Sequence, residues 1–536
     1  MELLFANAHA VHWSITTVFA LLLVGLILCL AFEEKIHAKK SIIAASFAAI
    51  CLLLGTFTGI LSFEKIVVGS HRAELRANEE VEVLVYSEDD PDSGEVIEVT
   101  GDLDESHQSP AADDHGEHGD GDDHAEPEHH TLHVDGHRLS TPVYIPGVDW
   151  SVIAIILGSS LFVDVTSKSG LFTWIAVKVT KASGGDPRRL LFFYGLMTVV
   201  FSAVLNNVTA MIIVGSLTAV SLDKLKQNKL LLGFLLIEGL LTNIGGLLTL
   251  ISSVPNIIVG TAADISFVTF FVKSAPFVVV ATLLTLWMGS MLFGITKLKD
   301  QSAKDEAKSL VAGFDENDGV QSWGFFRFSV VMLLLFIITI ATTSALPGIS
   351  KLGMGFVAMS FAVIMLWRFK SDVNRFYSAV DWDLLGFFIA LFMVIYVMEH
   401  ALVLERIGDG LQLVMTDISA ENPSAKDASL LLIGSAFFSS VTDNIPLAAM
   451  FASILSNLGA PENSTLWWSV IFGANLGGNI TPIGSASTLV AVTIMHKHKL
   501  TLSFAAFVKA AIPYAVVQIL LALVYVVFVL PLIKFG

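Results

Sequence analysis

The chain contains 536 residues, of which 54% are hydrophobic and 15% are charged, whereas about 25% of the residues in an ordinary soluble domain are charged. This composition excludes a soluble globular enzyme and indicates a protein of the lipid bilayer. The net charge of -18 is concentrated in one segment, and nucleic acid is not expected as a partner.

Apolar runs long enough to cross a membrane recur along the chain. A helix needs about 20 apolar residues to cross a hydrocarbon core of about 30 Å. The first run, 11–32, is not preceded by the basic residues of a signal peptide, so we expect it to remain as a transmembrane helix. The predicted spans are 11–32, 41–63, 149–167, 229–260, 266–295, 324–346, 352–369, 384–404, 466–493 and 503–533.

Residues 64–148 form an acidic segment between the second and third spans. Between Glu74 and Asp135 lie 22 of the 49 acidic residues, and the stretch from Glu88 to His137 is also rich in histidine. This composition cannot bury a core, so we expect that stretch to be disordered. Clustered histidines and carboxylates can also chelate transition metals, which leaves a membrane-tethered metal-binding protein as a hypothesis.

Two further apolar stretches, 190–222 and 428–458, are each interrupted by a polar cluster, Asn206–Thr209 and Thr442–Pro446. Backbone groups at membrane depth must lie inside protein or face a water-filled cavity. Both stretches are therefore predicted to be re-entrant hairpins.

Three short blocks occur twice in the same order, which indicates an internal repeat. The pairs are Val148–Trp150 with Val380–Trp382, Phe201–Asn207 with Phe438–Asn444, and Thr242–Gly246 with Ala474–Gly478. Each half holds five spans and one hairpin, and an odd number of spans inverts the second half relative to the first. The predicted fold is an all-α integral membrane protein of two inverted-topology repeats, with broken helices at the midplane.

Basic residues of the short loops fall on one face of this arrangement, which we expect to be cytoplasmic. Both termini and the acidic segment would then be external, and a bacterial inner membrane is the expected location. The predicted organisation is N-terminal scaffold helices (1–63), an acidic external loop (64–148), a first transport repeat (149–296), a cytoplasmic linker (297–323), a second scaffold pair (324–379) and a second transport repeat (380–536).

Neutral oxygen ligands in the first half form a candidate ion site where the hairpin tip should meet the helix break. Amide, hydroxyl and freed carbonyl oxygens suit a small cation, whereas helix N-termini there would attract anions. The same side chains could instead only join helices through hydrogen bonds. The candidates are Asn206, Asn207, Thr209, Thr242, Asn243 and Gly246.

Asp443 distinguishes the second half, because Asn206 fills the equivalent position in the first. An acid at the tip of a membrane hairpin is costly unless it is paired. It could bind a cation when ionised and a proton when neutral, which is the minimal switch of an antiporter, and neither tip carries a basic residue. The other candidates here are Asn444, Asn475, Gly478, Thr481 and Ser485.

Glu238 and Glu399 are further candidates for proton coupling beside Asp443, because ionisable residues within spans are functional by default. Asp164 lies close to the predicted cytoplasmic boundary, where water would solvate it. No His-Glu-x-x-His or Walker A motif occurs, so neither a zinc protease nor an ATP-driven pump is supported.

At these residues the chain resembles the ion transporter superfamily, in the branch of arsenite permeases, NhaD-type sodium/proton antiporters and the melanosomal P protein. The resemblance covers about residues 149–534 and implies paired hairpins, a transport domain that moves against a scaffold domain, and a homodimer. Relatives commonly have acids where this chain has Asn206 and Ser253. The matching motifs are Leu205–Thr209, Thr242–Gly246, Pro255–Asn256, Asp443–Pro446 and Gly473–Gly484.

We therefore predict a secondary active transporter rather than an enzyme, exchanging a cation such as sodium for protons by alternating access. The alternative is an anion transporter for arsenite or a small carboxylate, coupled to protons or sodium. The expected partners are a small inorganic ion and the bilayer, with no resident cofactor or metal.

Overall fold

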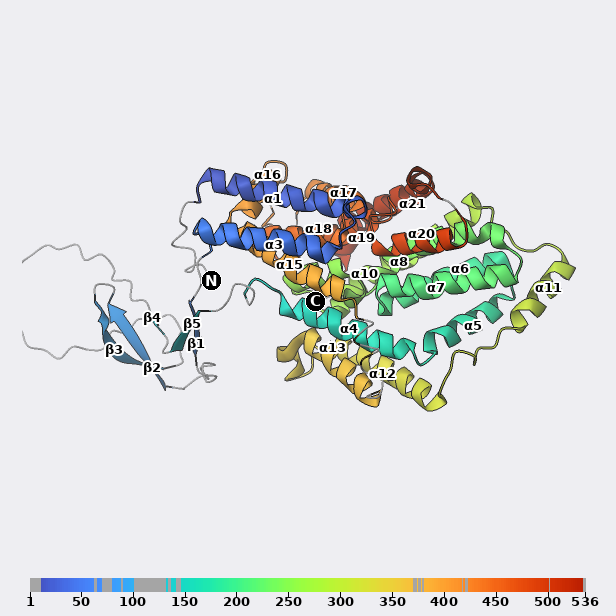
Figure 1. Cartoon of the computed structure of the whole chain (residues 1–536), viewed down its shortest axis with the longest axis horizontal. Helices are drawn as coiled ribbons and strands as arrows, with labels where there is room; N and C mark the ends of the chain where they lie inside the picture. The colour runs from blue at the N-terminus through green and yellow to red at the C-terminus, as the bar shows by residue number, and fades with distance from the viewer. Residues whose placement is uncertain are drawn as a thin grey trace, which may run out of the picture. The chain divides into compact units, whose positions relative to one another are not determined.

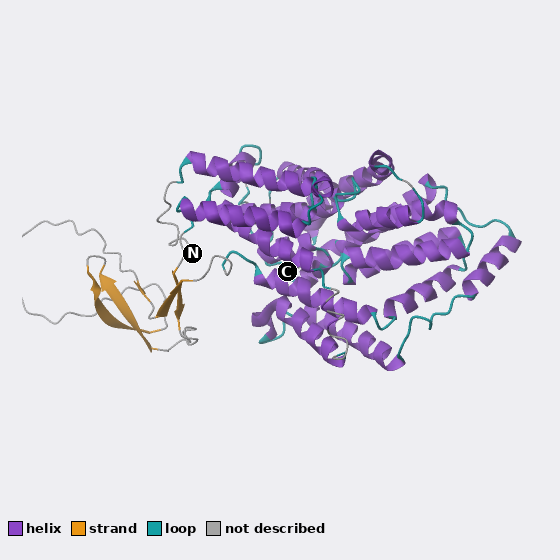
Figure 2. Ribbon diagram, in the orientation of Figure 1, coloured by secondary structure: helices purple, strands orange, loops and turns teal. Residues whose placement is uncertain are grey.

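The computed structural model describes residues 11–61, 65–69, 80–87, 90–100, 132–133, 136–140, 146–369, 374, 377, 380–416, 418–419, 423–500 and 502–533. The chain divides into a large unit, Met1–Leu61 with Gly147–Gly536, and a small unit, Ser62–Pro146. The large unit consists of helices throughout its described residues (Figures 1 and 2), which confirms the all-α prediction for the membrane part.

The helices of the large unit follow the chain in two similar series. The first series is α1 (Trp13–Ala31), α2 (Glu33–Ile36), α3 (Lys40–Phe57), α4 (Trp150–Ser167), α5 (Leu171–Ser183), α6 (Pro187–Val204), α7 (Asn207–Lys224), η2 (Asn228–Leu230), α8 (Leu231–Gly246), η3 (Leu250–Ser252), α9 (Val254–Ala262) and α10 (Phe267–Leu292). The linker carries α11 (Gln301–Ala312). The second series is α12 (Trp323–Ala341), α13 (Ile349–Arg368), α15 (Trp382–His400), α16 (Val403–Gln412), α17 (Ala425–Val441), α18 (Asn444–Asn457), α19 (Thr465–Gly477), α20 (Ala486–Lys497), α21 (Phe504–Val524), η4 (Tyr525–Val529) and η5 (Leu530–Leu532).

Among the described residues, ten helical segments are long and apolar enough to cross a membrane, so the chain is a multi-pass membrane protein. Eight predicted spans correspond to single long helices: α1, α3, α4, α10, α12, α13, α15 and α21. The remaining two predicted spans, 229–260 and 466–493, are both interrupted. The segment Pro187–Val204, predicted as one arm of a hairpin, also has the length and hydropathy of a span.

The two helix breaks lie slightly later in the chain than the sequence predicted. Thr242–Gly246 forms the last turn of α8, and the irregular backbone follows it up to Val254. In the second half α19 ends at Gly477 and α20 begins at Ala486. Gly245 lies within the helix, and its lack of a side chain allows close packing against α6. A Cβ there would lie 2.7 Å from the Val199 carbonyl oxygen.

Equivalent hydrogen bonds hold the hairpins against the broken helices in both halves. Ser202 Oγ donates to the Thr242 carbonyl at 2.7 Å, and Ser439 Oγ donates to the Ala474 carbonyl at 2.5 Å. Likewise, Thr249 Oγ1 donates to the Ala203 carbonyl and Thr481 Oγ1 donates to the Ser440 carbonyl, both at 2.6 Å. The internal repeat therefore extends to individual bonds, while its inversion relative to the membrane stays a prediction.

The helix pair that precedes each half packs against the other half. α3 packs along α15, and α13 packs along α4; Figure 1 shows α1 and α3 side by side above α15, and α13 beside α4. The α4–α13 contact is close, because a Cβ on Gly158 would lie 2.5 Å from the Ala358 carbonyl carbon. The sequence repeat alone gave no sign of this exchange.

The described residues of the small unit form two antiparallel sheets. β1 (Lys65–Gly69) pairs with β5 (Gly136–Ser140), with Lys65 opposite Ser140. β2 (Glu80–Ser87) pairs with both β3 (Asp90–Thr100) and β4 (Leu132–His133).

The prediction of disorder from Glu88 to His137 was therefore wrong for β3, β4 and the start of β5. The missed signal is the alternation of acids with valine in Glu80–Val83 and the β-branched residues of Glu95–Val99, which are typical of strands. The most histidine-rich part, 101–131, lies outside the described residues.

Candidate functional site

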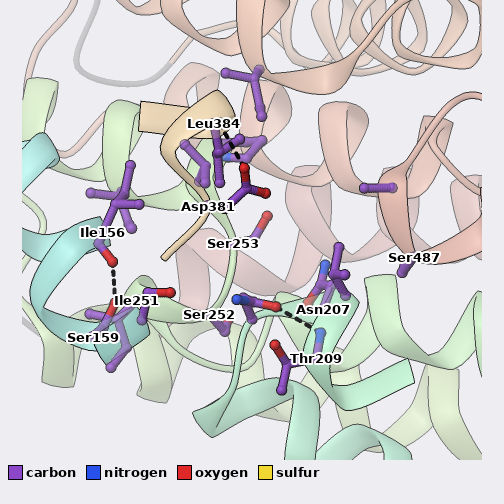
Figure 3. A pocket seen from close by; sticks show the side chains of 18 of the residues that line it. Ile156, Ser159, Asn207, Thr209, Ile251, Ser252, Ser253, Asp381, Leu384 and Ser487 are labelled. Atoms are coloured by element: carbon purple, nitrogen blue, oxygen red, sulfur yellow. Dashed lines mark hydrogen bonds between the residues drawn. The ribbon is translucent and has the colours of Figure 1, made fainter. Parts of the chain in front are cut away.

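A cavity of about 350 Å³ lies where the two hairpin tips approach the two helix breaks. Its walls come from α4, both tips, the segment that leads into α9, and the first residues of α15 and α20. Figure 3 shows Asp381, Ser253, Asn207, Thr209 and Ser487 around it. Elements far apart in the sequence thus meet at one site, as the repeat predicted.

Half of the residues predicted to bind the ion or substrate line this cavity. They are Asn206, Asn207, Thr209, Asn243, Asn444 and Ser485. The structure places the other six behind the wall or beside it, and they are Thr242, Gly246, Asp443, Asn475, Gly478 and Thr481. Gly246 is needed for packing, because a Cβ there would lie 2.8 Å from the Asn207 amide.

Asn243 links the two halves at the cavity wall. Its Nδ2 donates to Asn479 Oδ1 at 2.8 Å and to Ser485 Oγ at 2.9 Å, and its Oδ1 accepts from Ser487 Oγ at 3.1 Å. Asn207 Nδ2 also reaches Oδ1, at 3.4 Å. One amide of α8 therefore connects the first hairpin with the second helix break.

Asn475, the equivalent of Asn243, makes the reciprocal connection. It accepts from Ser253 Oγ at 2.8 Å and donates to Asn256 Oδ1 at 2.9 Å. Ser253 and Ser485 are themselves equivalent by the repeat. The side-chain amide of Asn475 is therefore used to join helices. Asn243 joins helices too, but it also faces the cavity.

The carboxylates that line the cavity are Asp164 and Asp381. Asp381 also caps α15, because its Oδ1 accepts from the Leu384 amide at 3.0 Å, as Figure 3 shows. Among the described lining residues no lysine, arginine or histidine occurs. In the sequence, Asp381 stands out only as part of the repeat, and Asp164 lies near the predicted cytoplasmic boundary, so neither was predicted to be an ion-binding residue.

Asp443 does not line the cavity, although its neighbours Asn444 and Ile445 do. Its Oδ1 caps α18 by accepting from the Ile445 amide at 3.2 Å. Its Oδ2 lies 2.6 Å from Nζ of Lys40, the first residue of α3. The hairpin itself has no basic residue at its tip, but the fold brings one there from 403 residues away.

Glu238 is fully buried in α8, outside the cavity wall. Its Oε1 accepts from Thr218 Oγ1 at 2.6 Å, and its Oε2 has no hydrogen-bond partner among the described residues. A carboxylate buried in this way is costly to keep charged. Glu238 therefore remains a candidate to carry a proton.

Glu399 lies at the opposite end of α15 from Asp381 and is exposed. Eighteen residues of helix separate the two acids, which corresponds to roughly 27 Å. The neighbouring His400 makes a local bond between Nδ1 and the Tyr396 carbonyl at 2.9 Å. A proton-coupling role for Glu399 stays a prediction, and it would have to act away from the cavity.

Five of the described helices begin at the cavity: α7, α9, α15, α18 and α20. Helix N-termini carry partial positive charge and free amide groups. Four of them are capped by their own N-cap side chains, from Asn206, Asp381, Asp443 and Ser485. The site therefore combines two acids with a set of inward-facing helix N-termini.

Paired hairpins, broken helices and a polar cavity between them are the features of a secondary transporter. The citrate transporter family matches residues 131–473, more than half of the chain, and the chain belongs to this family. It is accordingly a membrane transporter and not an enzyme.

Related proteins agree with this assignment. An uncharacterized transporter from Mycobacterium bovis is 30% identical over 385 residues, covering 71% of this chain and 86% of the relative. A 46 kDa membrane protein from Mycobacterium leprae is 31% identical over the same shares of both chains. The P protein of Mus musculus is 25% identical over 74% of this chain and 55% of its own length. The resemblance to the P protein branch is thereby confirmed.

The YdaH transporter of Alcanivorax borkumensis is similar in structure over 91% of this chain and 98% of its own. Its TM-score is 0.49 and its sequence identity is 12%.

Proposed function

We propose that this protein exchanges a small cation, most simply sodium, for protons across the cell membrane by alternating access. The observation that carries the proposal is the lining of the cavity. Its ionisable side chains, Asp164 and Asp381, are both acids. The surrounding hydroxyl and amide oxygens are hard, neutral ligands of the kind that small cations bind.

Acidic side chains inside and beside the cavity are candidates to carry the proton. Asp164 and Asp381 could release a proton when the cation binds. Glu238 supplies a further carboxyl group, which is buried one to two helical turns before Asn243 on the same helix. Asp443 lies next to the lining residue Asn444 and takes part through the pair described below.

The test is proton movement in proteoliposomes after addition of sodium, lithium or potassium. Asp381→Asn is the informative variant, because asparagine caps a helix as well as aspartate does and only the charge is lost. We expect cation-driven exchange to fall by at least about tenfold, which corresponds to roughly 1.4 kcal/mol. Asp409→Asn, at an exposed surface position, is the matched control and should leave exchange unchanged. Full activity in Asp381→Asn would contradict the proposal.

A second candidate is a carrier for an inorganic or carboxylate anion. The helix N-termini at the cavity favour this candidate, as does the name of the family. Cation-independent uptake of labelled citrate, succinate or arsenite into the same vesicles, with no proton movement on addition of cations, would establish this candidate instead.

The external position of residues 64–148, an inner-membrane location and a homodimer belong to the same proposal. Labelling of the acidic segment from outside intact cells and the mass of the purified protein in nanodiscs test them.

A further inference from the structure

Lys40 and Asp443 form an ion pair where the second hairpin meets the helices α3 and α15. Lys40 starts α3, which packs along α15, and the next residue, Ser41, donates from Oγ to Asp383 Oδ1 at the start of α15. Asp443 belongs to the second hairpin, which packs against α19. The ion pair therefore spans the boundary between α3–α15 and the hairpin.

The geometry of the pair is close and partly shielded from solvent. Lys40 Nζ lies 2.6 Å from Asp443 Oδ2 and 3.6 Å from Glu33 Oε1. The exposed fractions of the Lys40 and Asp443 side chains are 29% and 15%. Removing one partner of such a pair destabilises the protein, because the remaining charge is poorly solvated.

We propose that Lys40 is a tethered counter-ion that Asp443 exchanges for the transported cation or proton. The inference rests on the proposed cation/proton exchange. When the hairpin moves away from α3, the Asp443 carboxylate loses its ammonium partner. It must then take up a cation or a proton, so movement of the hairpin is coupled to ion uptake at its tip.

The kinetic consequence is a split between affinity and rate. Without the Lys40 ammonium, no tethered charge competes for Asp443, so a cation binds more tightly and leaves more slowly. Lys40→Gln should lower the apparent KM for sodium by about tenfold, equivalent to roughly 1.4 kcal/mol, and should also lower the maximal exchange rate. A purely structural role would reduce the rate without lowering KM.

The experiment measures sodium-driven proton exchange in proteoliposomes for Lys40→Gln, Lys40→Arg and the neighbouring control Lys39→Gln. Lys39 is exposed and should give wild-type kinetics, while Lys40→Arg keeps a cation and should give a KM close to that of the wild type. An unchanged or raised KM in Lys40→Gln overturns the proposal.

A measurement without transport separates this proposal from the function on which it rests. Thermal unfolding of Lys40→Gln, Asp443→Asn and the double variant should show non-additive losses, with the double variant more stable than the sum of the single losses predicts. Additive losses would show that the two charges do not interact and would overturn the proposal. If the losses are non-additive but the wild type shows no cation-driven exchange, the ion pair between Lys40 and Asp443 is real. The proposed cation/proton exchange and its coupling to this ion pair are then both wrong.

Discussion

Equivalent asparagines in the two halves have different surroundings. Asn243 faces the cavity and bonds across to Ser485, whereas Asn475 is occupied by Ser253, Asn256 and the Ile471 carbonyl. The sequence predicted both as ligands because the repeat treats them alike. It also left open that such residues only join helices, and for Asn475 the hydrogen bonds favour that interpretation.

Asn475→Ala should therefore act mainly on stability. The substitution leaves the buried side chains of Ser253 and Asn256 without their partner, which costs about 1–3 kcal/mol for each unsatisfied group. Unfolding of the purified protein, followed by near-ultraviolet circular dichroism, measures the loss. Asn228→Ala, which removes an exposed bond to Asp223, is the control and should have little effect. An unfolding curve for Asn475→Ala that matches wild type would refute this interpretation.

At the scale of elements, the broken helices pack backbone to backbone against the hairpins. A Cβ on Gly477 would lie 2.3 Å from the Ala436 carbonyl oxygen of α17, and one on Gly245 would lie 2.7 Å from that of Val199 in α6. The two contacts are related by the repeat. Their closeness allows the Ser202 and Ser439 hydroxyls to reach carbonyls of the broken helices.

Gly477→Ala should force α17 and α19 apart and destabilise the protein by about 1–3 kcal/mol, the usual cost of overpacking. Gly434→Ala in α17 is the matched control, because nothing lies within 4 Å of a Cβ there. Alanine favours helix over glycine by about 1 kcal/mol, so the control should be neutral or slightly stabilised. Thermal unfolding distinguishes the two variants, and equal stabilities would show that the contact is not tight in solution.

At the scale of the whole molecule, the linker between the halves is fastened to the first half. Lys178 Nζ lies 2.8 Å from Glu316 Oε1, and Lys181 contacts Oε2 of the same carboxylate. Nearby, a Cβ on Gly170 would lie 2.0 Å from the Gly319 carbonyl oxygen. The linker therefore runs in contact with α5 rather than freely.

Glu316→Gln should release this linker and speed its cleavage by trypsin at Lys299, Lys304 or Lys308. Hydrogen bonds from Lys178 and Lys181 lower the pKa of Glu316 to about 2. A lowered pKa means that the stabilisation is complete above the ordinary value of about 4.3 and is lost as the pH falls toward the folded value. Protection in the wild type should thus be constant between about pH 5 and about pH 8.

Glu306→Gln, which removes an exposed pair with Lys226 at 3.4 Å, is the control for this digestion. It should leave the cleavage rate close to that of the wild type, since exposed pairs contribute about 0–1 kcal/mol. Equal cleavage rates for the two variants would show that Glu316 does not hold the linker.

The sequence by itself determined the helical membrane architecture, both hairpins, the presence of helix breaks and six of the residues that line the cavity. These features are written in local patterns: hydropathy, polar interruptions and a repeated order of motifs. Only the tertiary structure decided that Asp164 and Asp381 line the cavity, that Lys40 reaches Asp443, and that each leading helix pair packs on the other half. The physical reason is that these contacts join residues hundreds of positions apart, and which faces of two helices meet is set by packing of the whole molecule.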